Sequence, residues 1–284
     1  MKIFLTYGLW PSLVFTCLWL HTVFLNMEIH VVLSTYLPFF AVVPVITFLE
    51  YLRPYSKEWM PQKEEIKTDI CFLVIVQILF EKFFTVGVIF GLLALWDLFN
   101  LPTYDIWPHH FPLWGQTVMI VFLNDLLHYF VHRAFHRVDF LWRFHKVHHS
   151  CDKFYWLTVA RFHPIDKGIQ HFCSVIPFVF IGVPEVALSY YYVFYFINSI
   201  LQHSNLDLKL GFLNYIVSTP YLHQWHHSAT ANGMHANYGN NLIVWDTVFG
   251  TKYSPSGDRV RVIGPGENHY PKTFLRQLLE PFSR

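Results

Sequence analysis

Residues 128–149 read HYFVHRAFHRVDFLWRFHKVHH, a stretch that holds six of the chain's 18 histidines. Its first three histidines are spaced four residues apart, and its last three follow an i, i+3, i+4 pattern. The segment HQWHH at residues 223–227 repeats that second pattern. On an α-helix each of these spacings places the imidazoles on one face. The stretch therefore predicts helices that each present a row of histidines.

Rows of histidine are what a metal site needs. Neutral imidazole is the commonest protein ligand for metals and suits iron, zinc, copper and nickel. Two metal ions need about eight or more ligand positions if some are to stay open for substrate or oxygen. The three triplets, together with His203 between the second and the third, supply enough imidazoles. No glutamate falls within the triplets, so an all-histidine dimetal site is expected rather than a ferritin-like one built on Glu-x-x-His pairs.

The composition indicates that lipid is part of the solvent. Hydrophobic residues make up 54% of the 284 residues and charged residues 14%, against roughly 25% charged residues in average soluble proteins. A formal net charge of +1 creates no field that would gather nucleic acid, so no nucleic-acid partner is expected. The four cysteines form no CxxC pair, which argues against a disulfide framework or a zinc ribbon.

Four stretches are apolar over about the 20 residues that a spanning helix needs: residues 3–25, 31–49, 70–98 and 113–131. The loops between them differ in charge. Residues 53–67 and 132–167 carry four and seven Lys or Arg residues, whereas 26–30 and 100–112 carry none. Because basic loops stay on the cytoplasmic side, we expect both termini and the histidine triplets there.

A fifth apolar stretch, residues 172–197, is interrupted by Gly182-Val183-Pro184. As one straight helix it would rise about 39 Å, cross a hydrocarbon core about 30 Å thick and separate His203 from the earlier histidines. All the histidines must meet at one metal pair, so we expect a re-entrant helical hairpin that turns at Gly182 and Pro184. The expected fold is an all-α integral membrane protein, with four transmembrane helices, this hairpin and a cytoplasmic helical cap that holds the dimetal site.

Longer motifs carry a family resemblance. The segments DLLHYFVHRAFH at 125–136, LWRFHKVHHS at 141–150 and HQWHH at 223–227 resemble the fatty acid hydroxylase / sterol desaturase superfamily of membrane di-iron enzymes. FLEYLRP at 48–54, RFHP at 161–164 and the tail, with NYG at 237–239 and WDTVFGT at 245–251, extend the likeness. The tail resembles the branch that contains alkylglycerol monooxygenase.

The resemblance implies a ligand set. Nine histidines would bind the metals: His132, His136, His145, His148, His149, His203, His223, His226 and His227. His128, His163 and Asp125 are possible additional ligands or partners of ligands. A ligand imidazole needs an acceptor for its other ring N–H, and Asp152, Asp166 and Asp246 are further candidates for that role. In domain terms, residues 1–112 would form N-terminal transmembrane helices, 113–253 a fatty acid hydroxylase-like catalytic domain with three histidine boxes, and 254–284 a C-terminal cytoplasmic tail.

The resemblance also implies a chemistry. Members use two Fe ions and O2 to hydroxylate or desaturate a C–H bond of a lipid such as a sterol, a fatty acyl chain or an alkylglycerol. The sequence has no dinucleotide or haem-attachment motif, so electrons must come from outside. The expected reductant is cytochrome b5 or a ferredoxin with its reductase, or a reduced pterin. The protein would lie in the endoplasmic reticulum of a eukaryote or the inner membrane of a bacterium.

Other uses of histidine stay open from the residues alone. A zinc-dependent membrane hydrolase would need a carboxylate base near the metals. A histidine-rich metal transporter or a haem electron carrier would place histidines at matched depths on separate spans. Here they cluster at the end of one span and in the polar segments that follow, which favours a site on one side of the membrane.

Overall fold

Long apolar helices form the N-terminal third of the chain in the computed structural model, which describes residues 3–99, 106–174, 176–255, 259–265 and 270–283. Three helical stretches are long and apolar enough to cross a membrane: Thr6–Asn26, Val31–Leu52 and Lys63–Leu95. Many of their large apolar side chains point outward; Phe83, for example, is 75% exposed. Such a surface is stable in lipid rather than in water. The regular structure of the described residues is helical throughout, as expected.

The first two of these stretches form a pair. The π-helical η1 (Phe4–Gly8) continues into α1 (Leu9–Asn26), and α2 (Val31–Leu52) returns beside it. The third stretch is one continuous helical run of α3 (Lys63–Cys71), the π-helical η3 (Phe72–Phe80) and α4 (Glu81–Leu98). It begins earlier than residue 70 because a capping box between Gln62 and Glu65 starts the helix in the polar segment.

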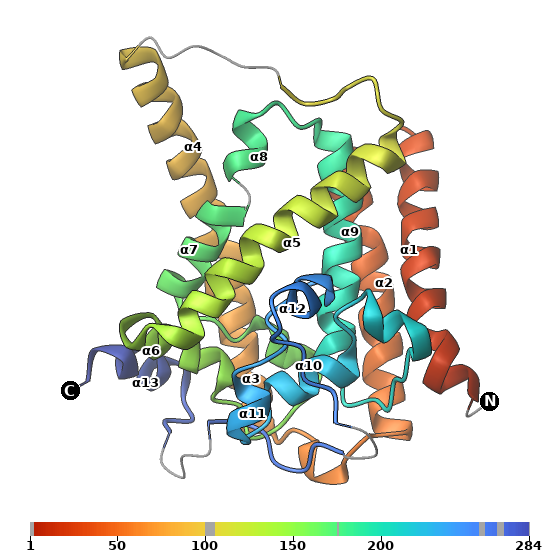
Figure 1. Cartoon of the computed structure of the whole chain (residues 1–284), viewed down its shortest axis with the longest axis vertical. Coiled ribbons are helices and arrows are strands. Elements are labelled where there is room, and N and C mark those ends of the chain that lie inside the picture. The colour runs from red at the N-terminus through yellow and green to blue at the C-terminus, as the bar shows by residue number, and fades with distance from the viewer. Residues whose placement is uncertain (1–2, 100–105, 175, 256–258, 266–269, 284) are drawn as a thin grey trace.

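The helix α5 (Leu113–Arg137) is the centre of the fold. It crosses the molecule diagonally in Figure 1 and packs against α6, α7 and α9. The fourth span expected from the sequence is its first part. By length and composition α5 is not among the three candidate spans, since Gln116, Asn124 and Asp125 lower its mean hydropathy. Its two halves differ: the first is largely apolar, whereas the second buries His128, His132 and His136.

The chain reverses where the glycine and proline interrupt the fifth apolar stretch. α7 (Pro164–Ser174) and α8 (Ile176–Phe180) run to one end of the molecule, and α9 (Glu185–Gln202) comes back from it. Gly182 lies in the turn with a φ of 79°, a conformation that favours glycine. α7 and α9 both pack against α5, and α9 also packs against α1 and α2. This path brings residue 203 back to the end of the molecule that holds α6 and α10.

Short helices and ordered loops close that end of the molecule. After α6 (Asp139–His149) come η4 (Trp156–Ala160) and, beyond α9, η5 (Gly211–Tyr215). They are followed by α10 (Pro220–His226), α11 (Ala231–Met234), α12 (Val244–Val248), α13 (Phe274–Leu279) and η6 (Glu280–Phe282). The 3-10 turn η2 (Lys57–Trp59) joins them from the link between α2 and α3. We call this assembly the cap.

Candidate metal centre

Nine buried histidines from four helices converge beneath the cap. They are the nine named from the sequence, and none is more than 7% exposed. α5 contributes two and α6 contributes three. His203 is the C-cap residue of α9, and the last three lie on α10 and at its C-cap. The helical spacing thus aims each row of imidazoles into the same interior space.

The nine histidines form two sets whose candidate ligand atoms lie within 4.8 Å of one another. The five-histidine group consists of His132, His136, His145, His149 and His226, and the four-histidine group of His148, His203, His223 and His227. Each HxxHH triplet is divided between the two groups: two members one turn apart face one group, and the third faces the other. The rings of His149 and His227 stack at 4.3 Å and join the groups.

Ring nitrogens face one another inside each group. The Nε2 atom of His132 lies 3.0 Å from Nε2 of both His145 and His226. In the four-histidine group, the Nε2 atoms of His203 and His223 are 2.9 Å apart. A metal at about 2.1 Å from each nitrogen would separate two ligands at right angles by about 3 Å. The spacing is therefore that of nitrogens around a shared cation.

Five of the nine imidazoles have an outward partner for Nδ1. The acceptors are the carbonyl oxygens of Tyr238, Arg161 and Ala236, the hydroxyl of Thr158 and the carboxylate of Asp166, at 2.7–3.2 Å from His132, His148, His226, His203 and His145 respectively. An acceptor at Nδ1 fixes the proton there and leaves Nε2 with a bare lone pair. Bare lone pairs 3 Å apart repel unless a cation lies between them.

The remaining histidines lack partners that would explain their burial. Both ring nitrogens of His136 and His149 are buried without a hydrogen bond to any described residue, and so is Nδ1 of His223 and of His227. An unsatisfied buried polar atom is costly. Metal coordination would satisfy one nitrogen of His136 and one of His149. His223 and His227 face their group with Nε2, 3.1 Å apart, and would coordinate through those atoms, so the donor set fits a pair of metal ions.

Burial holds these imidazoles in the form that metals bind. Desolvation lowers the pKa of His223 to about 3, with nearby histidines adding to the effect. The pKa values of His148, His149 and His226 are lowered well below the usual range, first by burial and then by neighbouring histidines. At neutral pH all four rings are therefore neutral and have a free lone pair to donate.

Asp166 is the carboxylate that touches the histidine set. It lies in the first turn of α7, is fully buried, and its Oδ2 accepts from Nδ1 of His145 at 2.9 Å. Its other oxygen accepts from the side-chain amide of Gln170, one turn later, at 2.5 Å. Both oxygens are thereby held in place, and the ring of His145 is fixed in turn.

The other acidic candidates have different partners. The two oxygens of Asp125 accept from the backbone amides of Asn241 and Leu242. Asp246 accepts from the amides of Tyr238 and Gly239. Both therefore brace the segment whose carbonyls hold His132 and His226, rather than an imidazole.

Asp152 and the two further histidines also lie apart from the ligand groups. Asp152 is exposed and pairs with Lys272 at 3.0 Å. His163 donates to the carbonyl of Leu278 and accepts from the amide of Ile165, a helix-capping arrangement. His128 is buried with its ring 5.8 Å from that of His132, outside both groups.

A small cavity adjoins both histidine groups. Its volume is about 30 Å³, and it is lined by His128 and His132 of α5, by Tyr195 and Gln202 of α9 and by Gln170 of α7, among others. This volume matches the space of about one water molecule. The histidines of the cluster and residues of α7 and α9 therefore share one small cavity.

One buried ion pair next to the site was not foreseen. Arg161 donates from Nε to Asp69 at 2.7 Å, and the hydroxyl of Tyr155 donates to the same carboxylate at 2.5 Å. Arg161 and Asp69 are both buried, and the carbonyl of Arg161 holds His148. The segment RFHP offered a signal for Arg161, but no local pattern marked Asp69, which lies 92 residues away.

Comparison with known proteins shows a family match over the histidine-bearing half of the chain. The model of the family described as fatty acid hydroxylase matches residues 117–251. Ornithine lipid hydroxylase OlsE of Rhizobium tropici is 31% identical over 248 residues, which cover 87% of this chain and 75% of that protein. No solved structure matches the chain significantly.

Two eukaryotic relatives are also similar. Methylsterol monooxygenase 1 of Rattus norvegicus is 27% identical over 76% of this chain and 75% of its own length. Alkylglycerol monooxygenase of Caenorhabditis elegans is 29% identical over 64% of this chain, but the match spans only 34% of that protein.

Proposed function

The chain belongs to the fatty acid hydroxylase family, and we propose that it is a membrane-bound di-iron oxidoreductase that hydroxylates a C–H bond of a lipid with O2. The observation that carries the proposal is the meeting of nine buried histidines in two adjacent groups. Three relatives of this chain are named as a lipid hydroxylase or as monooxygenases of an alkylglycerol or a methylsterol, which supports hydroxylation over desaturation.

Each histidine group would hold one iron. His132, His136, His145, His149 and His226 would bind the first, and His148, His203, His223 and His227 the second. The bound irons would supply the activation of dioxygen and the oxidation of the C–H bond. The chain's own part is to hold neutral imidazoles in place: Asp166 and the carbonyls of Tyr238, Ala236 and Arg161 fix ring orientation and keep the proton on Nδ1.

The lipid would reach the irons through the cavity beside His128. Part of its lining comes from α5, α7 and α9, the helices that we place in the membrane, and the cavity has only a small volume at the cluster. Such a narrow end admits a methylene or methyl group rather than a headgroup. We infer that the headgroup stays near the membrane surface while part of an acyl chain or a sterol enters.

The geometry disfavours the other uses of histidine. The two groups lie together beneath one cap, not at separate depths along parallel spans, as a transporter or haem carrier would require. The carboxylate that touches the cluster, Asp166, is already bound by His145 and Gln170, so it is not free to act as the base of a zinc hydrolase.

Electrons would come from a partner. We propose cytochrome b5 or a ferredoxin with its reductase, or a reduced pterin, acting from the cytoplasmic side, on which we also place the basic segments and the cap. On this proposal α5 is the fourth span, and α7–α9 form a re-entrant hairpin in the membrane of the endoplasmic reticulum or in a bacterial inner membrane.

Lipid analysis tests the function. The full chain and a His148→Ala/His226→Ala variant are expressed in the same host, and total lipids are compared by mass spectrometry. A lipid that gains one oxygen atom with the intact chain alone supports hydroxylation. A lipid that loses two hydrogens shows desaturation instead, and equal lipid profiles from equal amounts of both proteins contradict the proposal.

A further inference from the structure

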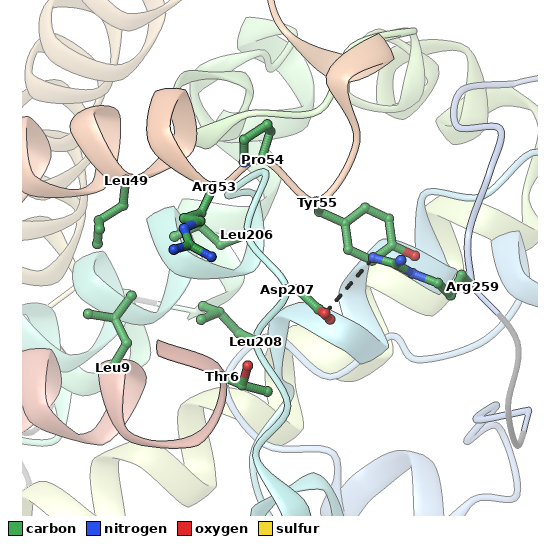
Figure 2. A pocket seen from close by; sticks show the side chains of 10 residues that line it. All are labelled: Thr6, Leu9, Leu49, Arg53, Pro54, Tyr55, Leu206, Asp207, Leu208 and Arg259. Atoms are coloured by element: carbon green, nitrogen blue, oxygen red, sulfur yellow. Dashed lines mark ion pairs between the residues drawn. The ribbon is translucent and has the colours of Figure 1, made fainter. Parts of the chain in front are cut away.

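A second and larger cavity lies away from the histidines. Its volume is about 230 Å³, and the residues that line it include none that line the cavity at the cluster. As Figure 2 shows, the lining side chains come from separate parts of the chain: the region around the start of α1, the end of α2 and the residues after it, the segment at 206–208, and Arg259 of the tail. A ligand bound there would touch both the N-terminal helices and the cap.

The cavity lies beside the ends of two candidate spans. Leu9 is the first residue of α1 and Leu49 belongs to the last turn of α2. The cavity therefore lies where the candidate span Thr6–Asn26 begins and the candidate span Val31–Leu52 ends. Leu9, Leu49 and Leu208 give it an apolar wall. An apolar wall that continues into membrane helices suits the first carbons of an acyl chain.

Three further lining residues are charged: Arg53, Asp207 and Arg259. In Figure 2, Arg53 projects among Leu9, Leu49 and Leu208, and it forms no ion pair with any residue in the described part of the chain. Arg259 lies over the ring of Tyr55 at 4.2 Å and faces Asp207 at 4.0 Å. Two arginines and one carboxylate give the lining a net positive charge. Arg53 is the arginine without an ion-pair partner among the described residues.

We propose that this cavity binds an anionic phospholipid, with the lipid phosphate on Arg53 and Arg259 and the start of an acyl chain on the leucines. Guanidinium groups form paired, charge-assisted hydrogen bonds with phosphate oxygens, and arginines at a membrane surface attract anionic lipids. Asp207 disfavours a second negative charge, so the site takes a headgroup with a single phosphate. The site binds lipid independently of turnover at the irons.

A lipid is favoured over an acidic protein because an apolar wall lies beside the two arginines. Both arginines are exposed, Arg259 by 59%, so an acidic protein could reach them, but it would gain nothing from a leucine wall at the end of two candidate spans. The lipid would also stabilise the cap. The amide of Lys209 donates to the carbonyl of Thr6, and the amide of Tyr55 donates to that of Asn205, two residues after His203.

The test measures binding and needs no activity. The full chain, purified in a neutral detergent, is titrated with phosphatidylglycerol or phosphatidylcholine, and bound lipid is counted by native mass spectrometry alongside the unfolding temperature. We expect phosphatidylglycerol to bind at least about tenfold more tightly and to raise the unfolding temperature. Loss of one charge-assisted hydrogen bond should weaken it about tenfold in Arg53→Gln and in Arg259→Gln.

Controls separate the possible sources of the effect. Arg261→Gln removes the same charge from an exposed position two residues away, outside the lining, and should bind lipid as the unchanged chain does. Equal binding of both lipids, or unchanged binding in Arg53→Gln, overturns the proposal. Binding of glycerol phosphate as tight as that of the lipid shows a site for free phosphates instead. A polyglutamate peptide that displaces phosphatidylglycerol through the same arginines shows a protein-docking surface instead.

Discussion

The Nδ1 atom of His145 lies 2.9 Å from Oδ2 of Asp166, with both side chains at most 1% exposed. The pair joins α6 to the first turn of α7, so the helix that starts the chain's reversal also orients a candidate ligand. Because the acceptor is a carboxylate rather than a carbonyl, it also makes the imidazole a stronger donor to a metal.

Loss of this carboxylate should weaken metal binding without unfolding the protein. For Asp166→Asn we expect metal affinity to fall about 10–100-fold, measured by competition with a chelator of known affinity. Asp152→Asn is the matched control, since Asp152 is exposed and pairs only with Lys272 among the contacts in the described chain. Equal affinity in both variants would remove Asp166 from the metal site.

The purified active protein should contain two irons per chain. Nine inward-facing histidines offer too many ligands for one ion, and the buried nitrogens without partners are spread over both groups. Metal analysis of anaerobically prepared protein, with turnover measured on the same sample, checks this number. Full activity with one zinc ion per chain would refute the di-iron assignment.

Replacing a histidine from either group should abolish turnover while the protein still inserts in the membrane. His148→Ala tests the four-histidine group and His226→Ala the five-histidine group. The three candidate spans form without these residues, so membrane fractions should contain normal amounts of both variants. His110→Ala, at an exposed position before the start of α5 and so at the opposite end of that helix from His132 and His136, should keep nearly normal turnover. Substantial activity in either cluster variant would show that the replaced histidine is not a ligand.

Breaking the buried ion pair should cost more stability than breaking a surface pair. Arg161→Gln leaves Asp69 buried without its partner, and we expect a loss of about 3–5 kcal/mol. Lys272→Gln breaks the exposed pair with Asp152, for which a loss of less than about 1 kcal/mol is expected. Denaturant unfolding in detergent measures both, and similar losses would show that the Arg161–Asp69 pair contributes little. Arg161→Gln should also loosen His148, because the carbonyl of residue 161 accepts from that ring.

The proposed topology can be tested by labelling single cysteines in a background without the four native ones. Cysteines at Lys153 and Lys209 flank the reversal through α7, α8 and α9, and both should react from the cytoplasmic side. A cysteine at His110, before α5, should react only from the other side. Labelling of positions 153 and 209 from opposite sides would mean that this segment crosses the membrane, which is incompatible with one shared metal site.

The sequence predicted best what depends on local spacing. The histidine rows indicate helical faces without any knowledge of tertiary contacts, and Gly182 and Pro184 mark a turn because their backbone preferences are local. The choice among Asp125, Asp166 and Asp246 could not be made, since each reaches its partner only through packing. The ion pair between Arg161 and Asp69 could not be predicted for the same reason, because packing alone brings the two residues together. The four-span count remains a prediction, because α5 combines an apolar first half with a polar second half.

The division of each HxxHH triplet between two groups has a consequence for how this protein can change over time. A one-residue insertion ahead of His145 would rotate the rest of α6 by about 100° and carry His148 away from one group together with His145 and His149 from the other. Changes of length in α6 or α10 therefore damage both halves of the centre at once. A variant that loses one metal and keeps the other would therefore have to arise by substitution of single histidines. Selection on either metal site then preserves the helical register of α6 and α10.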